Sequence, residues 1–238
     1  MLSMRDDAQR QVLMRFFRTA PGQYGEGDEF LGIKVPQTRA LVKSIRGEVS
    51  PEEIEHLLYS KWHEVRLCGF LLLVDEMKAL LPRRREPVSE RHAARRTIVD
   101  FYLKHARQAN NWDLVDLSCE YIVGEYLLYS PADETDILHR LADSDNLWEQ
   151  RIAIVSTLTL IRHNIFAPTL EIIEKLKSHP HDLIHKAMGW MLREIGKRDE
   201  YTLTAYLEAN YRQLPRTTLR YAIERFPAPV RHSWLTRK

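Results

Sequence analysis

Apolar residues in this chain recur every three or four positions, which is the spacing of one face of an α-helix. The first such stripe predicts a helix over residues 6–19, and its members are Val12, Leu13, Phe16 and Phe17. No stretch alternates between apolar and polar residues for long enough to predict a β-strand. Further stripes predict helices over about residues 36–46, 61–81, 89–109, 112–129, 148–162, 168–176, 181–196, 201–211 and 215–226.

Helix start and stop signals separate these stripes. Pro36 stands where a helix can begin, and Gly47 follows where it can end. Ser50 and Glu53 have the spacing of a capping box, so another helix is expected to start there. The segment Ser130–Asp133 predicts one more helix start.

The predicted helices number about twelve and pair into about six hairpins of roughly 35–45 residues, the size of HEAT-type repeats. Such hairpins stack side by side, and the second helix of each lines a concave face. We therefore expect an all-α fold, a right-handed α-solenoid of antiparallel helix pairs that forms one domain over residues 1–238. The repeats are expected over about residues 5–226, followed by a basic C-terminal tail over 227–238.

One row of positions recurs about every 35 residues in the second helices of these pairs. Its members are an acid, two bases and an aromatic residue, namely Asp116, Arg151, Lys186 and Tyr221. Trp112 and Trp190 each lie one helical turn from a member of the row. Because charged side chains are poorly suited to a core, the row predicts the lining of a groove.

The composition excludes a disordered chain, since 44% of the 238 residues are hydrophobic and 29% are charged. The longest apolar run, Phe70–Val74, is far too short to span a membrane, and the N-terminal residues lack the apolar segment of a signal peptide. Cys68 and Cys119 lie in apolar helical patterns and are expected to be buried free thiols. Free thiols suit a reducing compartment, so we expect a cytoplasmic protein that associates with the nucleoid when it acts.

Charge is unevenly distributed, although the formal net charge is only +2. Residues 211–238 hold six arginines and Lys238 against one acid, Glu224. Residues 81–96 hold a further six arginines and two glutamates. Basic stretches on a nearly neutral protein indicate an anionic partner such as nucleic acid. Solvated helix faces and a basic tail are the alternative, which composition leaves open.

Four motifs occur in order along the chain: Gly27–Pro36, Asn111–Asp116, Trp148–Arg151 and Gly189–Glu194. Together they resemble the bacterial DNA alkylation repair family, whose AlkD-type members are alkylpurine DNA glycosylases built of HEAT-like repeats. The resemblance runs over about residues 10–226. It implies a concave DNA-binding solenoid that cleaves the N-glycosidic bond of cationic N3- and N7-alkylated purines in double-stranded DNA.

The resemblance also implies which residues act on the lesion. Asp116 matches the catalytic carboxylate, Trp112 and Trp190 its aromatic flanks, and Tyr24 a loop aromatic near the lesion. The chemistry agrees, because alkylation makes the purine a cationic leaving group and a carboxylate stabilises the oxocarbenium-like sugar and positions water. Indole rings beside that sugar add cation–π attraction. The reaction needs no general acid, and we expect no metal ion or cofactor.

DNA-binding residues are expected on the later helices. The resemblance implies that Arg151 and Arg193 contact the DNA backbone, and Lys186 joins them through its place in the row. Some family members carry a lysine two turns beyond the arginine. This chain has Thr159 there, so Arg162 is the candidate for that phosphate contact. We expect a monomer that binds duplex DNA and takes no nucleotide cofactor.

Other interpretations stay open on the sequence alone. A HEAT-repeat protein can bind damaged or branched DNA without cutting it, or act as a protein-interaction scaffold. Arg151 can pair with Asp116 instead of with DNA. Asp113 stands in the first turn of its helix and is expected to interact with the helix dipole. The histidines of His179–His185 include an i,i+4 pair without a third ligand at a suitable spacing, so a metal site is not expected.

Overall fold

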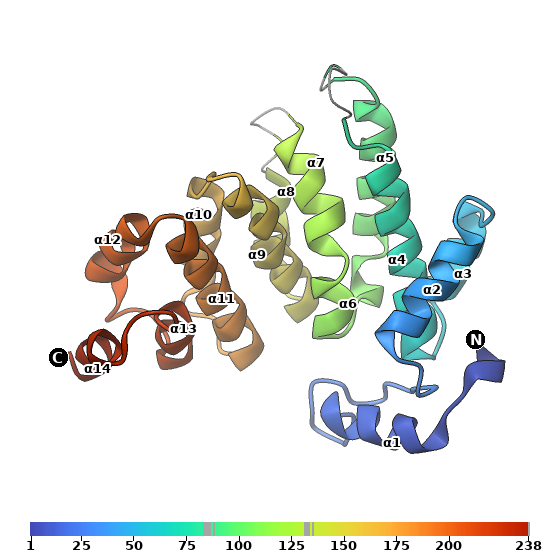
Figure 1. Cartoon of the computed structure of the whole chain (residues 1–238), viewed down its shortest axis with the longest axis horizontal. Helices are drawn as coiled ribbons and strands as arrows, with labels where there is room; N and C mark the ends of the chain where they lie inside the picture. Colours follow the sequence, from blue (N-terminus) through green and yellow to red (C-terminus); the bar gives the residue numbers. More distant parts are fainter. Residues whose placement is uncertain (83–86, 88, 131–133, 135, 238) are drawn as a thin grey trace. The chain divides into compact units, whose positions relative to one another are not determined.

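The computed structural model of the chain is predominantly helical (Figure 1). The residues that the structure describes are 1–82, 87, 89–130, 134 and 136–237. Within these ranges no strand forms, and one isolated bridge joins Glu29 to Trp62. The all-α class predicted from the sequence is therefore confirmed. The chain divides into two compact units, Met1–Ile122 and Val123–Lys238.

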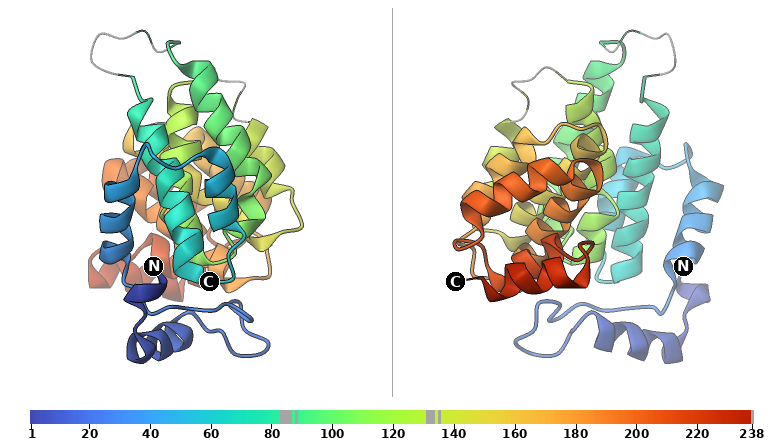
Figure 2. Two further views of the ribbon diagram at one scale, coloured as in Figure 1. Left: turned by 90° about the vertical axis from the view of Figure 1, so that its right-hand side faces the viewer. Right: turned by 60° about the vertical axis from the view of Figure 1, so that its left-hand side comes forward.

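The first unit packs its helices around one central apolar helix (Figure 2). Its helical segments are a 3₁₀ turn at Leu2–Met4, α1 (Asp7–Phe16), α2 (Val35–Ile45), α3 (Pro51–Leu58), α4 (His63–Ala79), α5 (His92–Lys104), a 3₁₀ turn at Ala106–Gln108 and α6 (Trp112–Asp116). The central helix is α4, which is buried along most of its length and packs against α2, α3, α5 and α6. Residues 17–34 join α1 to α2 and are called the glycine loop below.

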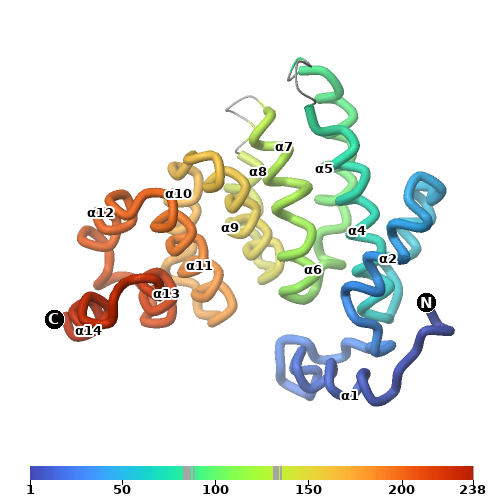
Figure 3. The backbone as a smooth tube through the Cα atoms, viewed as in Figure 1, coloured from blue at the N-terminus to red at the C-terminus, as the bar shows by residue number. Residues whose placement is uncertain are grey.

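In the second unit, the long helices each pack against several neighbours (Figure 3). A π-helical turn at Glu120–Gly124 leads into α7 (Glu125–Leu128), α8 (Asp136–Ala142), α9 (Leu147–Arg162), α10 (Ala167–Leu176), α11 (Asp182–Arg198), α12 (Glu200–Asn210), α13 (Arg216–Ala222) and α14 (Ala228–Thr236). The helix α9 packs against α7, α8, α10 and α11. In turn, α11 packs against α9, α10, α12 and α13.

Polar contacts between these helices recur at the length of one repeat. The ammonium group of Lys175 in α10 binds the carboxylate of Asp143, which follows α8, across 32 residues. The guanidinium of Arg151 in α9 donates to the carbonyl of Leu183 in α11, also across 32 residues. The Lys175 contact joins the first helices of two neighbouring hairpins, and the Arg151 contact joins their second helices. This is expected where each hairpin packs on the next.

Two predicted helices are shorter than expected. The helix predicted over 89–109 is confined to α5 and a separate turn at Ala106–Gln108. The helix predicted over 112–129 stops with α6 and resumes only as the π-helical turn and α7. Ser118 lies at the break, where its hydroxyl donates to the carbonyl of Leu114 at 2.6 Å. A hydroxyl that takes a carbonyl four residues back bends or interrupts a helix.

The C-terminal stretch also departs from the prediction. The helix predicted to be the last ends at Ala222, and α14 occupies the stretch predicted as a tail. Trp234 anchors α14, since it is 7% exposed and packs edge-on against Tyr211 with ring centroids 5.9 Å apart. Gly196, predicted to end a helix, lies inside α11, and a Cβ there would meet Leu203 at 2.4 Å, so the close packing of α12 explains the glycine.

Several local predictions are confirmed. Ser50 and Glu53 form the capping box, with the Ser50 amide donating to the Glu53 carboxylate at 2.8 Å. Cys68 and Cys119 are buried, and neither forms a disulfide within the described residues. None of the described helices is long and apolar enough to cross a lipid bilayer. The helix start predicted at Ser130–Asp133 falls on residues 131–133, which lie outside the described residues.

The glycine loop is fixed by a glycine that nothing larger can replace. Gly32 has φ +89°, and a Cβ there would lie 2.1 Å from the carbonyl oxygen of Asp6. Gly47 has a similar φ of +77° but open space around it. We expect Gly47→Ala to cost about 1–2 kcal/mol, from backbone strain alone. Gly32→Ala should cost about 1–3 kcal/mol more, because the chain must also move apart. Urea unfolding of the two variants measures the difference, and equal losses would contradict it.

Candidate active site

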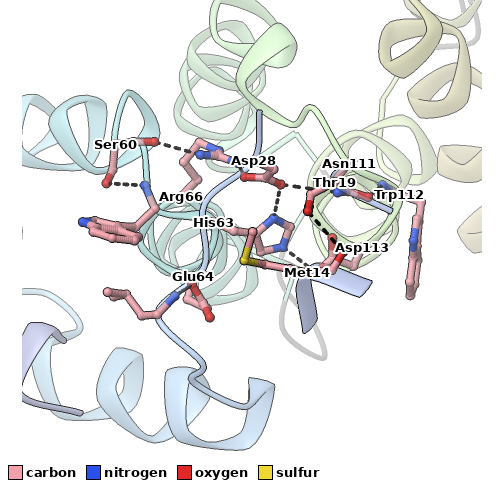
Figure 4. Close-up of polar contacts among 12 residues, drawn as sticks. Met14, Thr19, Asp28, Ser60, His63, Glu64, Arg66, Asn111, Trp112 and Asp113 are labelled. Carbon is pink, nitrogen blue, oxygen red and sulfur yellow. Dashed lines mark hydrogen bonds and ion pairs between the residues drawn. The ribbon is translucent and has the colours of Figure 1, made fainter. Parts of the chain in front are cut away.

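The start of α4 carries three charged side chains that the fold buries, although the stretch Leu67–Val74 that follows them is apolar. His63 and Glu64 are each 2% exposed, and Arg66 is 5% exposed. Buried charges must be paired or hydrogen-bonded, because an isolated charge in the interior is costly. All three side chains meet their partners in the glycine loop or in α6 (Figure 4).

Glu64 holds the loop by its main chain. One carboxylate oxygen accepts from the amide of Leu31 at 2.8 Å, and the other accepts from Gly32 at 2.8 Å and Ile33 at 3.1 Å. Bonds to an ionised carboxylate are about twice as strong as neutral ones. The backbone of His63 adds a fourth tie, since its amide donates to the carbonyl of Glu29 at 2.8 Å.

His63 bridges the loop and α6. Its Nδ1 lies 2.7 Å from Oδ2 of Asp28, and its Nε2 lies 2.9 Å from Oδ2 of Asp113. Asp28 has two further donors, the guanidinium of Arg66 at 2.5 Å and the side-chain amide of Asn111 at 3.4 Å. Asn111 also caps α6, because its side-chain oxygen accepts from the amide of Trp112 at 2.9 Å. We call Asp28, His63, Arg66, Asn111 and Asp113 the charged network.

The network holds His63 in its charged form. Burial alone lowers the pKa of His63, because it disfavours a charged ring, but the carboxylates of Asp113 and Asp28 outweigh burial and raise that pKa from 6.5 to about 9. Burial raises the pKa of Asp28, whereas His63 and Arg66 lower it, and the net result lies below the ordinary 3.8. At neutral pH the first unit therefore encloses an imidazolium between two carboxylates.

Aromatic rings continue the network toward the surface. Phe30 stacks on the His63 ring at 4.4 Å between centroids, and Phe17 stacks on Phe30 at 5.1 Å. Trp112 stacks on Phe17 at 5.3 Å with an interplanar angle of 27°. Phe16 packs edge-on against the indole at 5.9 Å. The ring of Trp112 is thus held in one orientation by α1 and the glycine loop.

A cavity of about 400 Å³ opens beside these rings. It lies between α1, the start of α2, the start of α4 and α6, and its walls are mainly apolar. Trp112 and Asp116, four residues apart in α6, both line it and are half-buried. The structure therefore places the predicted aromatic and the predicted carboxylate together at one cavity, on one face of a short helix.

The other predicted site residues are placed within their own units. Tyr24 is half-buried in the glycine loop. Arg151 is 5% exposed and donates to Leu183 at 2.7 Å, so its guanidinium serves the contact between α9 and α11. Trp190 is half-buried in α11, and Arg162 is exposed at the end of α9. A role in binding DNA stays a prediction for Arg151 and Arg162.

Lys186 and Arg193 of α11 take part in ion pairs at the surface. The ammonium group of Lys186 lies 2.7 Å from the carboxylate of Asp182, one turn earlier in the helix. Arg193 pairs with Glu224, which follows α13. Surface pairs of this kind are worth about 0–1 kcal/mol. Both cations can therefore exchange their partner for a phosphate at little cost, and their DNA contacts remain predictions.

Asp113 corrects one sequence interpretation. It does stand in the first turn of α6, but it is 5% exposed and its carboxylate is committed to His63. Its Oδ1 is buried and has no hydrogen-bond partner in the part of the chain that the structure describes. Asp113 is therefore a structural member of the charged network, and substituting it disturbs α6 itself.

The histidines near the start of α11 serve the backbone. His179 accepts from the amide of His181 at 3.0 Å, and His181 accepts from the amide of Leu183 at 3.1 Å. His185 donates through Nε2 to the carbonyl of His179. Among the described residues no group of three or more His, Cys, Asp or Glu side chains could hold a metal ion.

The charged network is the part of the site that the sequence interpretation missed. A signal was present, because Lys61–Arg66 places charged residues directly before Leu67–Val74, a stretch that is apolar on every side of the helix. A helix of that kind is buried, so its charges require partners elsewhere. What the sequence does not show is that Asp28, in a glycine-rich loop, is one of those partners.

Comparisons with known proteins agree with one another. The family model described as "DNA alkylation repair enzyme" matches residues 1–226. No curated protein matches the chain. A solved structure titled "Predicted DNA alkylation repair enzyme from Enterococcus faecalis" has a TM-score of 0.70 and is 17% identical, with 94% of this chain and 97% of that chain covered. At this identity the solved structure shows a shared fold, in keeping with the α-solenoid class predicted above.

The charged network predicts how stability varies with pH. Because the pKa of His63 is raised, the charged ring adds to the free energy of unfolding. That contribution is complete below pH 6.5 and is lost as the pH rises through about 9. The loss should be a few kcal/mol, at about 1.4 kcal/mol per pKa unit. Because the pKa of Asp28 is lowered, its contribution disappears as the pH falls below the ordinary 3.8.

Urea unfolding between pH 5 and 10 measures this dependence. His63→Gln should be less stable at pH 6 and should lose the alkaline decline. The matched control is His56→Gln, which changes an exposed histidine on α3 and should keep the wild-type profile. An alkaline decline that survives in His63→Gln would contradict the assignment.

Proposed function

Since the chain belongs to the family of DNA alkylation repair enzymes, its role lies in DNA repair, and we propose that it is a DNA glycosylase. Its substrate in this proposal is duplex DNA that carries a cationic N3- or N7-alkylated purine, and it hydrolyses the N-glycosidic bond. The observation that carries the proposal is the pair formed by Trp112 and Asp116, which line one cavity on one face of α6.

The proposed reaction suits a single carboxylate. The bond between C1′ and the purine nitrogen breaks, and its electron pair goes to the base, which becomes neutral. The sugar passes through an oxocarbenium-like state whose positive charge Asp116 stabilises. Water then bonds to C1′ and gives up one proton to the surrounding solvent. Because the leaving base is already cationic, no second acid is needed to protonate it.

Trp112 has a part in this proposal that its surroundings support. Its indole is held by stacking on Phe17 and by edge contact with Phe16. A fixed indole face beside a developing cation contributes about 0.5–2 kcal/mol of cation–π attraction. Trp190 is proposed as the second flank, and Tyr24 as the loop aromatic near the lesion. The apolar walls of the cavity keep water away from the sugar on the side of α1.

DNA binding is proposed to rest on basic residues of the second helices of the hairpins. Lys186 and Arg193 of α11 hold only surface ion pairs, and Arg162 is exposed. Arg151 is proposed to act at the same groove, although its guanidinium also supports α11. The basic stretch over residues 211–238 adds positive charge beyond these helices. Phosphate contacts of this kind supply affinity without reading sequence.

The decisive test of the proposed chemistry is Asp116→Asn. The amide keeps the shape of the carboxylate and loses its charge, so excision of N7-methylguanine should fall by roughly 10²–10³-fold. Binding to the same duplex should change little. The readout is free base released under single-turnover conditions. The matched control is Asp100→Asn, an exposed aspartate of α5 that pairs with Arg96 and should excise at the wild-type rate.

Neutral lesions extend this test. Uracil in the same duplex should not be released, because it is not a cationic leaving group. If Asp116→Asn excised N7-methylguanine at the wild-type rate, the proposed role of α6 in the reaction would be wrong. Binding without excision by any form of the protein would leave the non-catalytic DNA-binding alternative.

Salt dependence tests the proposed DNA contacts. The logarithm of the binding constant for undamaged duplex should fall linearly with the logarithm of salt concentration, with a slope of several units. Lys186→Gln should reduce that slope by about one. The matched control is Arg140→Gln on α8, because Arg140 also pairs with an aspartate one turn away. An equal effect of both changes would show that net charge, and not the α11 surface, determines binding.

A further inference from the structure

We propose that His63 is a positioning residue for Trp112 and Asp116, because its imidazolium joins the glycine loop to the first turn of α6 and its deprotonation releases that turn. The inference rests on the proposed function, since it assigns to His63 a control over the same site. His63 lines the cavity with Asp116 but is given no contact with the substrate.

The helix that carries the site cannot hold itself in place. α6 has five residues, whereas isolated helices shorter than about 12–15 residues are marginal in water. Its orientation therefore depends on its anchors. Leu114 and Val115 are fully buried on one side, and Asp113 and Asn111 tie the N-terminal end to the charged network. A turn of α6 about its axis moves Asp116 together with these anchors.

The bridge needs two donors on one ring. An imidazolium has an N–H on each side, and it donates to Asp28 and to Asp113 at the same time. A neutral ring keeps only one N–H, so its other nitrogen presents a lone pair to a carboxylate oxygen less than 3 Å away. Whichever nitrogen keeps the proton, the bridge that the ring makes between Asp28 of the loop and Asp113 of α6 is broken.

The two carboxylates respond differently to the loss of the bridge. Asp28 keeps the guanidinium of Arg66 and the amide of Asn111. Among the described residues, Asp113 has one hydrogen bond to a side chain, the bond between its Oδ2 and Nε2 of His63, and its Oδ1 has no partner. With the remaining proton on Nδ1, the nitrogen with the shorter contact, the loop stays anchored and α6 loses its first-turn contact. The effect falls on the helix that carries Trp112 and Asp116.

The surroundings set the pH at which this happens. Phe30 stacks on the His63 ring and Phe17 packs against it at a tilt, and the imidazole is 2% exposed. The charged groups around it on the packed elements are Asp28 and Lys34 of the loop, Glu64 and Arg66 of α4, and Asp113 and Asp116 of α6. Glu64 is committed to the loop amides, so the two bridging carboxylates dominate. They hold the pKa of His63 at about 9, well above neutral pH.

The first experiment separates chemistry from binding. Single-turnover excision of N7-methylguanine is measured from pH 6 to 10, with protein-free release subtracted, and duplex affinity is measured at the same pH values. The wild-type rate constant should fall above about pH 9 while affinity changes little. His63→Gln should excise roughly 10²-fold more slowly at pH 7, the cost of an active group displaced by about 1 Å. Its alkaline decline should disappear.

Two further variants distinguish positioning from general stability. His63→Gln/Asp113→Asn replaces the ion pair by two amides that can bond without charge, so it should recover part of the lost rate and remain independent of pH. His56→Gln on α3 should match the wild type throughout. A purely structural role would lower stability but leave the rate per folded molecule, and its alkaline decline, unchanged.

A readout independent of activity keeps the two proposals apart. The chain has five tryptophans, and replacing them with 5-fluorotryptophan gives each one a fluorine NMR resonance. The resonance that is absent in Trp112→Phe belongs to Trp112. The Trp112 resonance should shift with a midpoint near pH 9 in the wild type and not in His63→Gln. This shift without any excision would uphold the positioning role and reject the glycosylase. Excision profiles of wild type and His63→Gln that superimpose, or a Trp112 resonance that ignores pH, would overturn the inference.

Discussion

A positive charge enclosed between two carboxylates is the interaction on which the first unit depends. His63 is held by Asp28 on one side and Asp113 on the other, with Arg66 balancing the second negative charge. Buried ion pairs add little net stability, but removing one partner costs several kcal/mol because a charge is left unpaired. The arrangement therefore contributes chiefly to the specificity of the fold, because its contacts form in one relative placement of the glycine loop, α4 and α6.

The sequence predicts the second unit better than the first, and the reason is physical. Helices α9, α11 and α13 follow one repeat, so their apolar stripes and their intervals report the packing directly. In the first unit the decisive contacts join α4 to an irregular loop, and nothing periodic marks Asp28 as the partner of His63. The break after α6 was missed for a similar reason, since the hydroxyl of Ser118 bonds to the carbonyl of Leu114 within a good apolar pattern.

That Trp112 and Asp116 lie on one face of a helix was predictable, because residues four apart in a helix share a face. Asp113 was misread for the opposite reason. Its place in the first turn of α6 suits a helix dipole, and only the tertiary contact with His63 shows its main role. Position along a helix thus identified which side chains share a face. It did not identify which of them are buried in tertiary contacts.

Glu64 recognises the glycine loop through three main-chain amides and no side chain of that loop. These hydrogen bonds therefore depend on the position of the backbone and not on the side chains of residues 31 and 33. Such a contact fixes the backbone of the loop from outside, so the side chains of the loop can change without affecting it. The wall of the cavity that Phe30 and Ile33 form can accordingly be reshaped to a different ligand without loosening the attachment of the loop to α4.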